Sequence, residues 1–195
     1  MVKYEFETPE QNIARKIMGG NFYGIPEIEK SIGWSSDVQE RQLGLIPYSE
    51  EQLRTCSQSH VLVAVIPRSL LFFQSMLKHL FVHPDHEWTD RTFLANFGSI
   101  GWLLVSKTAQ TQKPFQAPDI RELTCVMIAT FLSKGEKLFP EGHPVLSSTK
   151  AADRETYAAV RWKEDRLIYS WEELREGTLF AGCVRSFSRS ADKLA

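Results

Sequence analysis

The segment from residue 79 to residue 87 has the highest density of groups that could bind a metal. Imidazoles four residues apart on a helix can share one metal ion. Pro84 falls directly after the second histidine and interrupts such a helix. Two interpretations stay open, a metal-dependent hydrolase centre and a polar loop that is rich in histidine, and we favour the loop. The residues concerned are His79, His83, Asp85, His86 and Glu87.

The cysteines and glycines carry no catalytic signature. Cys56, Cys125 and Cys183 are far apart, and none belongs to a C-x-x-C pair. Cys125 lies in a strongly apolar stretch, which is typical of a buried thiol. The chain has no G-x-S-x-G, P-loop or G-x-G-x-x-G motif. The sequence therefore favours a protein that is not an enzyme and holds no cofactor, with a Cys-His pair assembled by folding as the open alternative.

The C-terminal third of the chain is rich in Trp, Tyr and Arg, the residue types that dominate binding hot spots. On a strand over residues 166–171, side chains alternate, so Tyr169 and Trp171 would lie on the face opposite Arg166. One face must pack against a core, so each aromatic residue has packing as the alternative to binding. The predicted ligand-binding residues are Trp162, Asp165, Arg166, Tyr169, Trp171 and Arg175.

Strand-like segments must position these side chains. The runs 156–162 and 166–171 predict a β-hairpin, and Lys163-Glu164-Asp165 is its expected three-residue turn. The run 179–187 predicts a third strand, with Gly182 at a bulge or a close approach between chain segments.

The other segments predict a mixed body of helices and sheet. Residues 60–66 form a Val-rich run typical of a strand that is buried on both faces. Pro118 and Asp119 open a helix with a wide apolar face that ends before Gly135. Residues 69–81 have helical character, although strand stays open. Shorter helices are expected after Thr8, with Ile13, Ile17 and Met18 on one face, then over 26–31, from about Ser35, and after Ser49.

These elements predict an α+β fold in which short N-terminal helices pack on a mixed or antiparallel sheet. We expect a helical N-terminal segment over residues 1–58 and an α+β core domain over residues 59–195. The length of 195 residues suits a chain that needs neither metal nor disulfide to hold its core.

Charge and composition limit the class of partner. Lys plus Arg total 23 and Asp plus Glu total 24, a net charge of -1 that disfavours nucleic acid and a polybasic membrane contact. No apolar stretch is long enough to span a membrane. Three cysteines without a signal peptide favour reduced thiols and a cytoplasmic location. The expected partner is a protein or peptide, and the oligomeric state stays open.

Five stretches between residues 21 and 139 resemble a family of small bacterial proteins that has no established activity. They are NFYGIPEIEKSIGW, PYSEEQL, HVLVAVIP, GWLLVSKT and VMIATFLSKGEKLF. This resemblance implies nothing about chemistry.

A second resemblance concerns the C-terminal part. The stretch GEKLFPEGHPVL, followed by TYAAVRW, RLIYSW and CVRSFSR, is similar to the formylglycine-generating-enzyme branch of C-type lectin-like domains. Cys183 has no partner cysteine in this region, so the resemblance implies the scaffold and not that enzyme's chemistry. Such domains display polar and aromatic residues to a ligand, which agrees with the candidate residues between Trp162 and Arg175.

The leading hypothesis is a non-enzymatic binding module. Its face would comprise the 163–165 turn, the loop after Trp171, and Arg175. One alternative is a metal-dependent hydrolase that uses His79, His83 and His86. Another is a structural or interaction protein, which predicts an exposed apolar patch around Leu70 to Phe81 that a partner covers.

Overall fold

The structure, a computed structural model, describes residues 7–32, 43, 45–82, 94–95, 100–112, 114, 116–151 and 155–184. This part of the chain forms five α-helices and two four-stranded sheets, each with parallel and antiparallel pairs. The predicted α+β class and the mixed character of the sheet are confirmed. The sequence predicted one sheet, whereas the structure has two.

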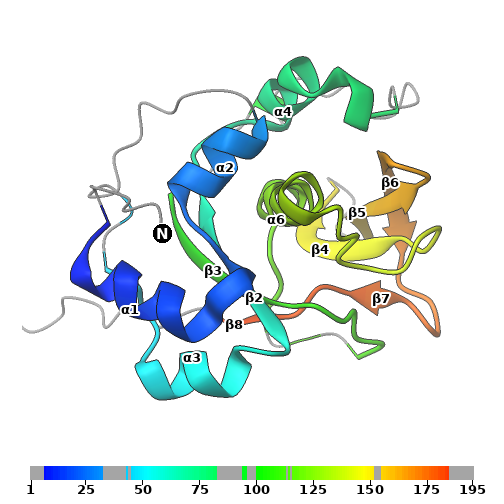
Figure 1. Ribbon diagram of the computed structural model, residues 1–195. Helices are drawn as coiled ribbons and strands as arrows, with labels where there is room; N and C mark the ends of the chain where they lie inside the picture. Colours follow the sequence, from blue (N-terminus) through cyan, green and yellow to red (C-terminus); the bar gives the residue numbers. More distant parts are fainter. Residues whose placement is uncertain are drawn as a thin grey trace, which may run out of the picture.

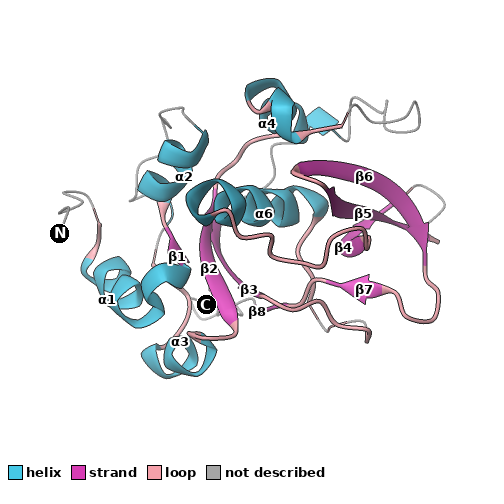
Figure 2. Cartoon of the chain, turned by 45° about the vertical axis from the view of Figure 1, so that its right-hand side comes forward, coloured by secondary structure: helices cyan, strands magenta, loops and turns pink. Residues whose placement is uncertain are grey.

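The first sheet has the strand order β1-β2-β3-β8. Its strands are β1 (Phe22–Tyr23), β2 (His60–Val65), β3 (Gly101–Ser106) and β8 (Cys183–Val184). The hydroxyl of Tyr48 fixes the β3–β8 edge, because it donates to the carbonyl of Val184 at 2.6 Å and accepts from the amide of Leu104 at 3.1 Å. The helices α1 (Pro9–Met18) and α3 (Glu50–Cys56) lie on the side of this sheet that faces away from α6 (Ile120–Lys134), as Figures 1 and 2 show.

The second sheet has the order β6-β5-β4-β7. Its strands are β4 (Val145–Lys150), β5 (Thr156–Lys163), β6 (Arg166–Glu173) and β7 (Leu179–Phe180). The sequence predicted the β5–β6 hairpin but not β4, which lies at the centre of the sheet. The predicted strand over 179–187 divides into β7 and β8, which belong to different sheets. Gly182 lies at this crossing, where a Cβ would approach Gln110 Nε2 at 2.8 Å, so the predicted close approach is confirmed.

Helix α6 lies between the two sheets and contacts β2 on one side and β4 and β5 on the other (Figure 1). All its residues from Ile120 to Thr130 are buried. The sequence predicted one wide apolar face, but a helix covered by two sheets is buried all round. Even Arg121 is buried, and its guanidinium donates to the carbonyl of Ile66 at 3.1 Å.

The predicted helix ends are confirmed where the structure describes them. Thr8, Ser49 and Asp119 each cap a helix through a capping box, and Gly135 ends α6 with φ 69°. Helix α2 (Ile25–Ile32), predicted over 26–31, buries Ile25, Ile28 and Ile32. In α1 the buried residues are Gln11, Ala14 and Met18, while Ile13 is 40% exposed, so the predicted inner face was wrong by part of a turn.

Most of the segment 69–81 is helical, which settles a question that the sequence left open. Ser69 caps α4 (Leu70–Met76), and a 3-10 turn, η3 (Lys78–Leu80), follows it. Four apolar side chains of this segment are buried: Leu70, Phe73, Leu77 and Leu80. The predicted helix near Ser35 lies outside the described residues.

The boundary predicted at residue 58 remains a prediction. Strand β1, from the N-terminal segment, pairs with β2, and its residues belong to the same buried core as the later strands. Among the described helices, none combines the length and the apolar character needed to cross a bilayer.

Candidate functional site

The β5–β6 hairpin carries the predicted ligand-binding residues, and its turn is tighter than the sequence suggested. Lys163 pairs with Arg166, so the turn consists of Glu164 and Asp165 alone. Glu164 has φ 54°, and no other non-glycine residue in the described part of the chain has a positive φ. A positive φ at the first turn position matches the type II′ pattern, which suits the twist of paired strands. Asp165 and Arg166 therefore lie at the exposed tip of the hairpin.

Trp162 and Tyr169 are buried, so their predicted role at an exposed ligand surface needs correction. Trp162 is 0% exposed, and its ring packs on Phe131 with 4.8 Å between centroids. Tyr169 is 5% exposed, and its hydroxyl lies 3.0 Å from Thr124 Oγ1. Burial raises the pKa of the Tyr169 hydroxyl. Both side chains lie on the face of the sheet that α6 covers, so they contribute to packing.

Trp171 and Arg175 lie toward the other end of the hairpin. Trp171 is half-buried opposite Ala158, and Arg175 is exposed and pairs with Glu173 at 3.3 Å. Because a strand rises by about 3.3 Å per residue, roughly 16 Å separates Trp171 from Arg166 along β6. The six predicted residues therefore do not form one continuous face.

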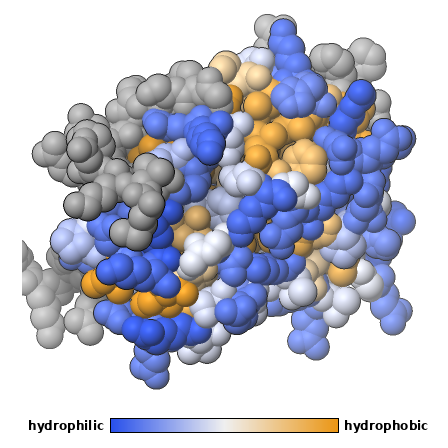
Figure 3. Space-filling model, viewed as in Figure 1, coloured by the Kyte–Doolittle hydropathy of each residue, from blue (hydrophilic) through white to orange (hydrophobic). Residues whose placement is uncertain are grey.

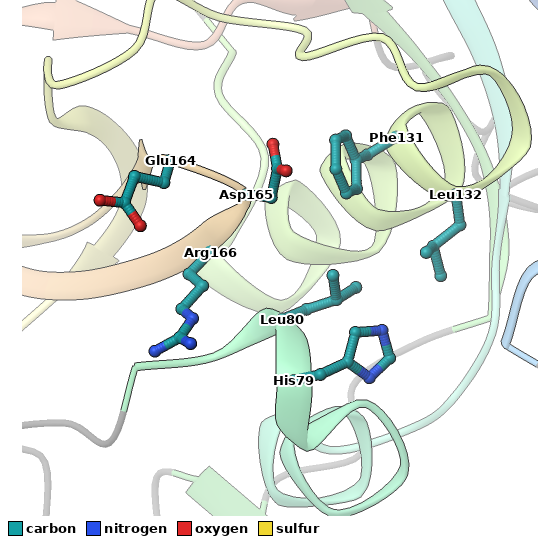
Figure 4. Close-up of a pocket in the computed structure, with 7 residues that line it drawn as sticks. All are labelled: His79, Leu80, Phe131, Leu132, Glu164, Asp165 and Arg166. Carbon is teal, nitrogen blue, oxygen red and sulfur yellow. The ribbon is translucent and has the colours of Figure 1, made fainter.

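A pocket of about 430 Å³ opens beside the hairpin turn, and we name it the turn pocket (Figure 4). Three elements meet there: η3, the end of α6 and the turn itself. A bridge between Phe81 and Leu167 holds η3 next to β6, and the amide of Val82 donates to the carbonyl of Leu167 at 3.1 Å. The lining residues are His79, Leu80, Phe131, Leu132, Glu164, Asp165 and Arg166.

Around the turn pocket, some charged side chains have an ion-pair partner in the described structure and others do not. The Lys137 ammonium lies 3.2 Å from the Asp165 carboxylate and 2.9 Å from that of Glu141. The hydrogen bond with Glu141 raises the pKa of Lys137, and the same bond lowers the pKa of Glu141. Arg166 is exposed and has no ion pair or hydrogen bond with any side chain that the structure describes.

A second pocket, of about 220 Å³, lies at the strand end of the hairpin, and we name it the strand-end pocket. Glu172, Glu173 and Glu176 line it, and its one lining arginine, Arg175, is paired with Glu173. Ser170 Oγ donates to the carboxylate of Glu172 at 2.7 Å. The strand-end pocket therefore carries an excess of negative charge.

Of the residues predicted to form a metal-binding cluster, the structure describes only His79. His79 is exposed at the turn pocket, while His83, Asp85, His86 and Glu87 lie outside the described residues. Within the described ranges, no group of three or more His, Cys, Asp or Glu side chains could hold a metal. The metal-dependent hydrolase stays a prediction of the sequence.

None of the three cysteines, all of which the structure describes, belongs to a disulfide. Cys125 is 1% exposed, and burial raises its pKa to about 11. Burial also raises the pKa of Cys56. A raised pKa lowers the thiolate fraction at neutral pH, so these two thiols are weak nucleophiles.

The apolar segment 70–81 exposes only part of its surface. Leu71 is 39% exposed and Met76 is 41% exposed, both on α4. Figure 3 shows apolar surface in the upper part of the view, where Figure 1 places α4. Both side chains are therefore partly covered by the rest of the described structure, and the interaction protein with a large apolar patch stays a prediction of the sequence.

Sequence reasoning missed the residues that form the apolar part of the turn pocket. Phe131 and Leu132 were treated only as part of a core helix, yet both are half-buried at the end of α6. The available signal was the length of α6. Its apolar stretch continues to the last turn before Gly135, and a helix end that leaves the core brings apolar side chains to the surface.

Comparisons with protein-family models, with curated proteins and with solved structures gave no match to this chain. The two resemblances noted in the sequence therefore remain predictions.

Proposed function

We propose that this protein is a non-enzymatic binding module that recognises a protein or peptide ligand at the turn pocket. The observation that supports the proposal is an apolar pocket floor bordered by a guanidinium that pairs with none of the described side chains. Leu80, Phe131 and Leu132 supply the apolar groups, and Arg166 supplies the cation. This combination of aromatic and arginine side chains is typical of binding hot spots.

The size and polarity of the turn pocket suit one or two side chains of a peptide. Its volume of about 430 Å³ falls within the usual range of ligand pockets. His79, Asp165 and Arg166 add donors and acceptors around the rim, which a peptide backbone can use. The near-neutral net charge of the chain gives no support to nucleic acid as the partner.

The same proposal includes a location and a scaffold for the protein. A cytoplasmic location is supported by the three cysteines outside any disulfide in the described structure, which are typical of reducing compartments. A C-type lectin-like scaffold is supported by the sequence resemblance alone, and such domains present polar and aromatic side chains to ligands.

Selection of peptides from a random library on the immobilised protein tests the proposal. We expect selected peptides to bind the Leu132→Ser variant about tenfold more weakly, since the change removes part of the apolar floor. Leu174→Ser is the matched control, because Leu174 is 49% exposed and lies beyond the other end of the hairpin. Thermal unfolding confirms that both variants are folded. A library that yields no binder, or equal affinity for Leu132→Ser and the wild type, would reject the turn pocket as the site.

A further inference from the structure

We infer that the turn pocket, if it binds peptides as proposed, receives the C-terminal residue of its partner. A large apolar side chain would occupy the floor, and the free terminal carboxylate would bind Arg166. This inference rests on the proposed function and adds the chemical class of the ligand.

The anion site follows from the pairing of charges at the hairpin tip. Arg166 is the first residue of β6, is exposed and lacks a partner in the described structure. Asp165, next to it, is already engaged by Lys137 at 3.2 Å, an ammonium that it shares with Glu141. In Figure 4 the Glu164 carboxylate is directed away from the other lining side chains. A planar guanidinium can bind a carboxylate through two parallel hydrogen bonds, a geometry that lysine lacks.

The apolar floor of the turn pocket is formed by side chains that already pack against the core. Phe131 packs on Trp162 with an angle of 44° between the rings, and Trp162 is itself fully buried. Leu80 approaches from η3 and is 2% exposed. A floor that is already positioned loses little conformational entropy when a ligand binds.

A chain terminus satisfies both parts of the pocket with a single residue. In an extended peptide, neighbouring side chains point to opposite faces, so an acidic residue beside an apolar one points away from the same pocket. The terminal carboxylate is instead attached to the Cα atom that bears the apolar side chain. In the view of Figure 4, His79 and Arg166 lie on either side of Leu80. The imidazole therefore adds a polar group to the rim of the pocket on the far side of Leu80 from Arg166, where it can bond to the peptide backbone.

Isothermal titration with small matched peptides tests the inference. The probes are acetyl-diglycyl-phenylalanine, its C-terminal amide, and an amidated peptide in which glutamate precedes the phenylalanine. We expect the free acid to bind about tenfold more tightly than the amide, as for one charge-assisted contact. We expect the glutamate peptide to behave like the amide.

Two variants locate the carboxylate. Arg166→Gln should abolish the difference between acid and amide, while Arg175→Gln should preserve it, since Arg175 is an equally exposed arginine at the strand end of the hairpin. Circular dichroism confirms folding of both variants.

The outcomes separate this inference from the proposed function. Equal binding of acid and amide, no binding of the acid, or tight binding of the internal glutamate peptide each overturns the C-terminal assignment. The library selection with Leu132→Ser decides independently whether the turn pocket binds peptides at all.

Discussion

The two ends of the β5–β6 hairpin carry similar residue types with different surroundings. At the turn end, Trp162 is buried behind Phe131, and Arg166, beside an apolar floor, pairs with no side chain in the described part of the chain. At the strand end, Trp171 is half-buried, and Arg175 is paired with Glu173 among further glutamates. Residue type alone therefore does not identify a binding site in this hairpin. The neighbours supplied by other elements decide which arginine is available.

The position of helix α6 accounts for the difference between the two ends of the β5–β6 hairpin. Its last described turns pass behind the hairpin tip and bring Phe131 and Leu132 to Arg166. The strand end instead lies next to the loop over residues 175–178, which leads into β7. In this loop the amide of Arg175 donates a hydrogen bond to Thr178 Oγ1 at 2.9 Å. That loop contributes carboxylates, so the strand end suits a cation better than an anion.

The largest expected effect compares the two tryptophans. Trp162→Ala should lower the free energy of unfolding by about 3–5 kcal/mol, because it leaves a cavity between the hairpin and α6. Trp171→Ala should cost roughly 1–2 kcal/mol, since its side chain is only half-buried. Urea denaturation followed by circular dichroism measures both. Similar losses in the two variants would show that the ends of the hairpin do not differ in packing.

A smaller effect is expected at the turn itself. Glu164→Gly should raise the free energy of unfolding by about 1 kcal/mol, because glycine tolerates the positive φ at this position without strain. Asp165→Gly is the control and should not stabilise the protein, since the φ of Asp165 is not positive. Denaturation midpoints report the difference. A destabilised Glu164→Gly variant would contradict the two-residue turn.

The smallest effect is a local dependence on pH at the turn end. The Glu141 carboxylate accepts from Lys137 and from the amide of Glu164, and these bonds lower its pKa. A lowered pKa in the folded state means that this support of the turn is complete above the ordinary pKa of glutamate. It is lost as the pH falls through the lowered value.

Nuclear magnetic resonance can follow this titration through the chemical shift of the Glu164 amide. We expect a midpoint below that of an ordinary glutamate, and Lys137→Gln should move it upward. The amide of Glu176, at the strand end, serves as a reference that should not show this dependence on Lys137. A Glu164 midpoint at the ordinary value would remove the bond with Glu141 from the description of the turn.

Local signals explain why much of the fold was predictable. Thr8, Ser49 and Asp119 cap helices as their patterns indicate, because capping depends on residues only three positions apart. The Val-rich β2 and the alternating β5 and β6 are equally local. Strand β4 was missed because its last residues, Ser147 to Lys150, resemble a polar loop, and its pairing with β5 and β7 supplies the order that its composition lacks.

The candidate site was predictable only in part, because some of its residues come from segments that are distant in the sequence. Asp165 and Arg166 could be placed at a hairpin tip from their own neighbourhood. Their apolar counterparts Leu80 and Phe131 are distant in sequence, and only the docking of η3 and α6 brings them together.

The sequence by itself determined the α+β class, the ends of the described helices and the hairpin that carries the arginines. These features follow from hydrogen bonds and side-chain periodicity over a few residues. The tertiary structure alone decided that Trp162 and Tyr169 belong to the core, that one C-terminal run supplies strands to two sheets, and that Arg166 lines the same pocket as apolar side chains from η3 and α6. Burial and charge pairing depend on which distant segments become neighbours, and that choice is made by the packing of both sheets around α6.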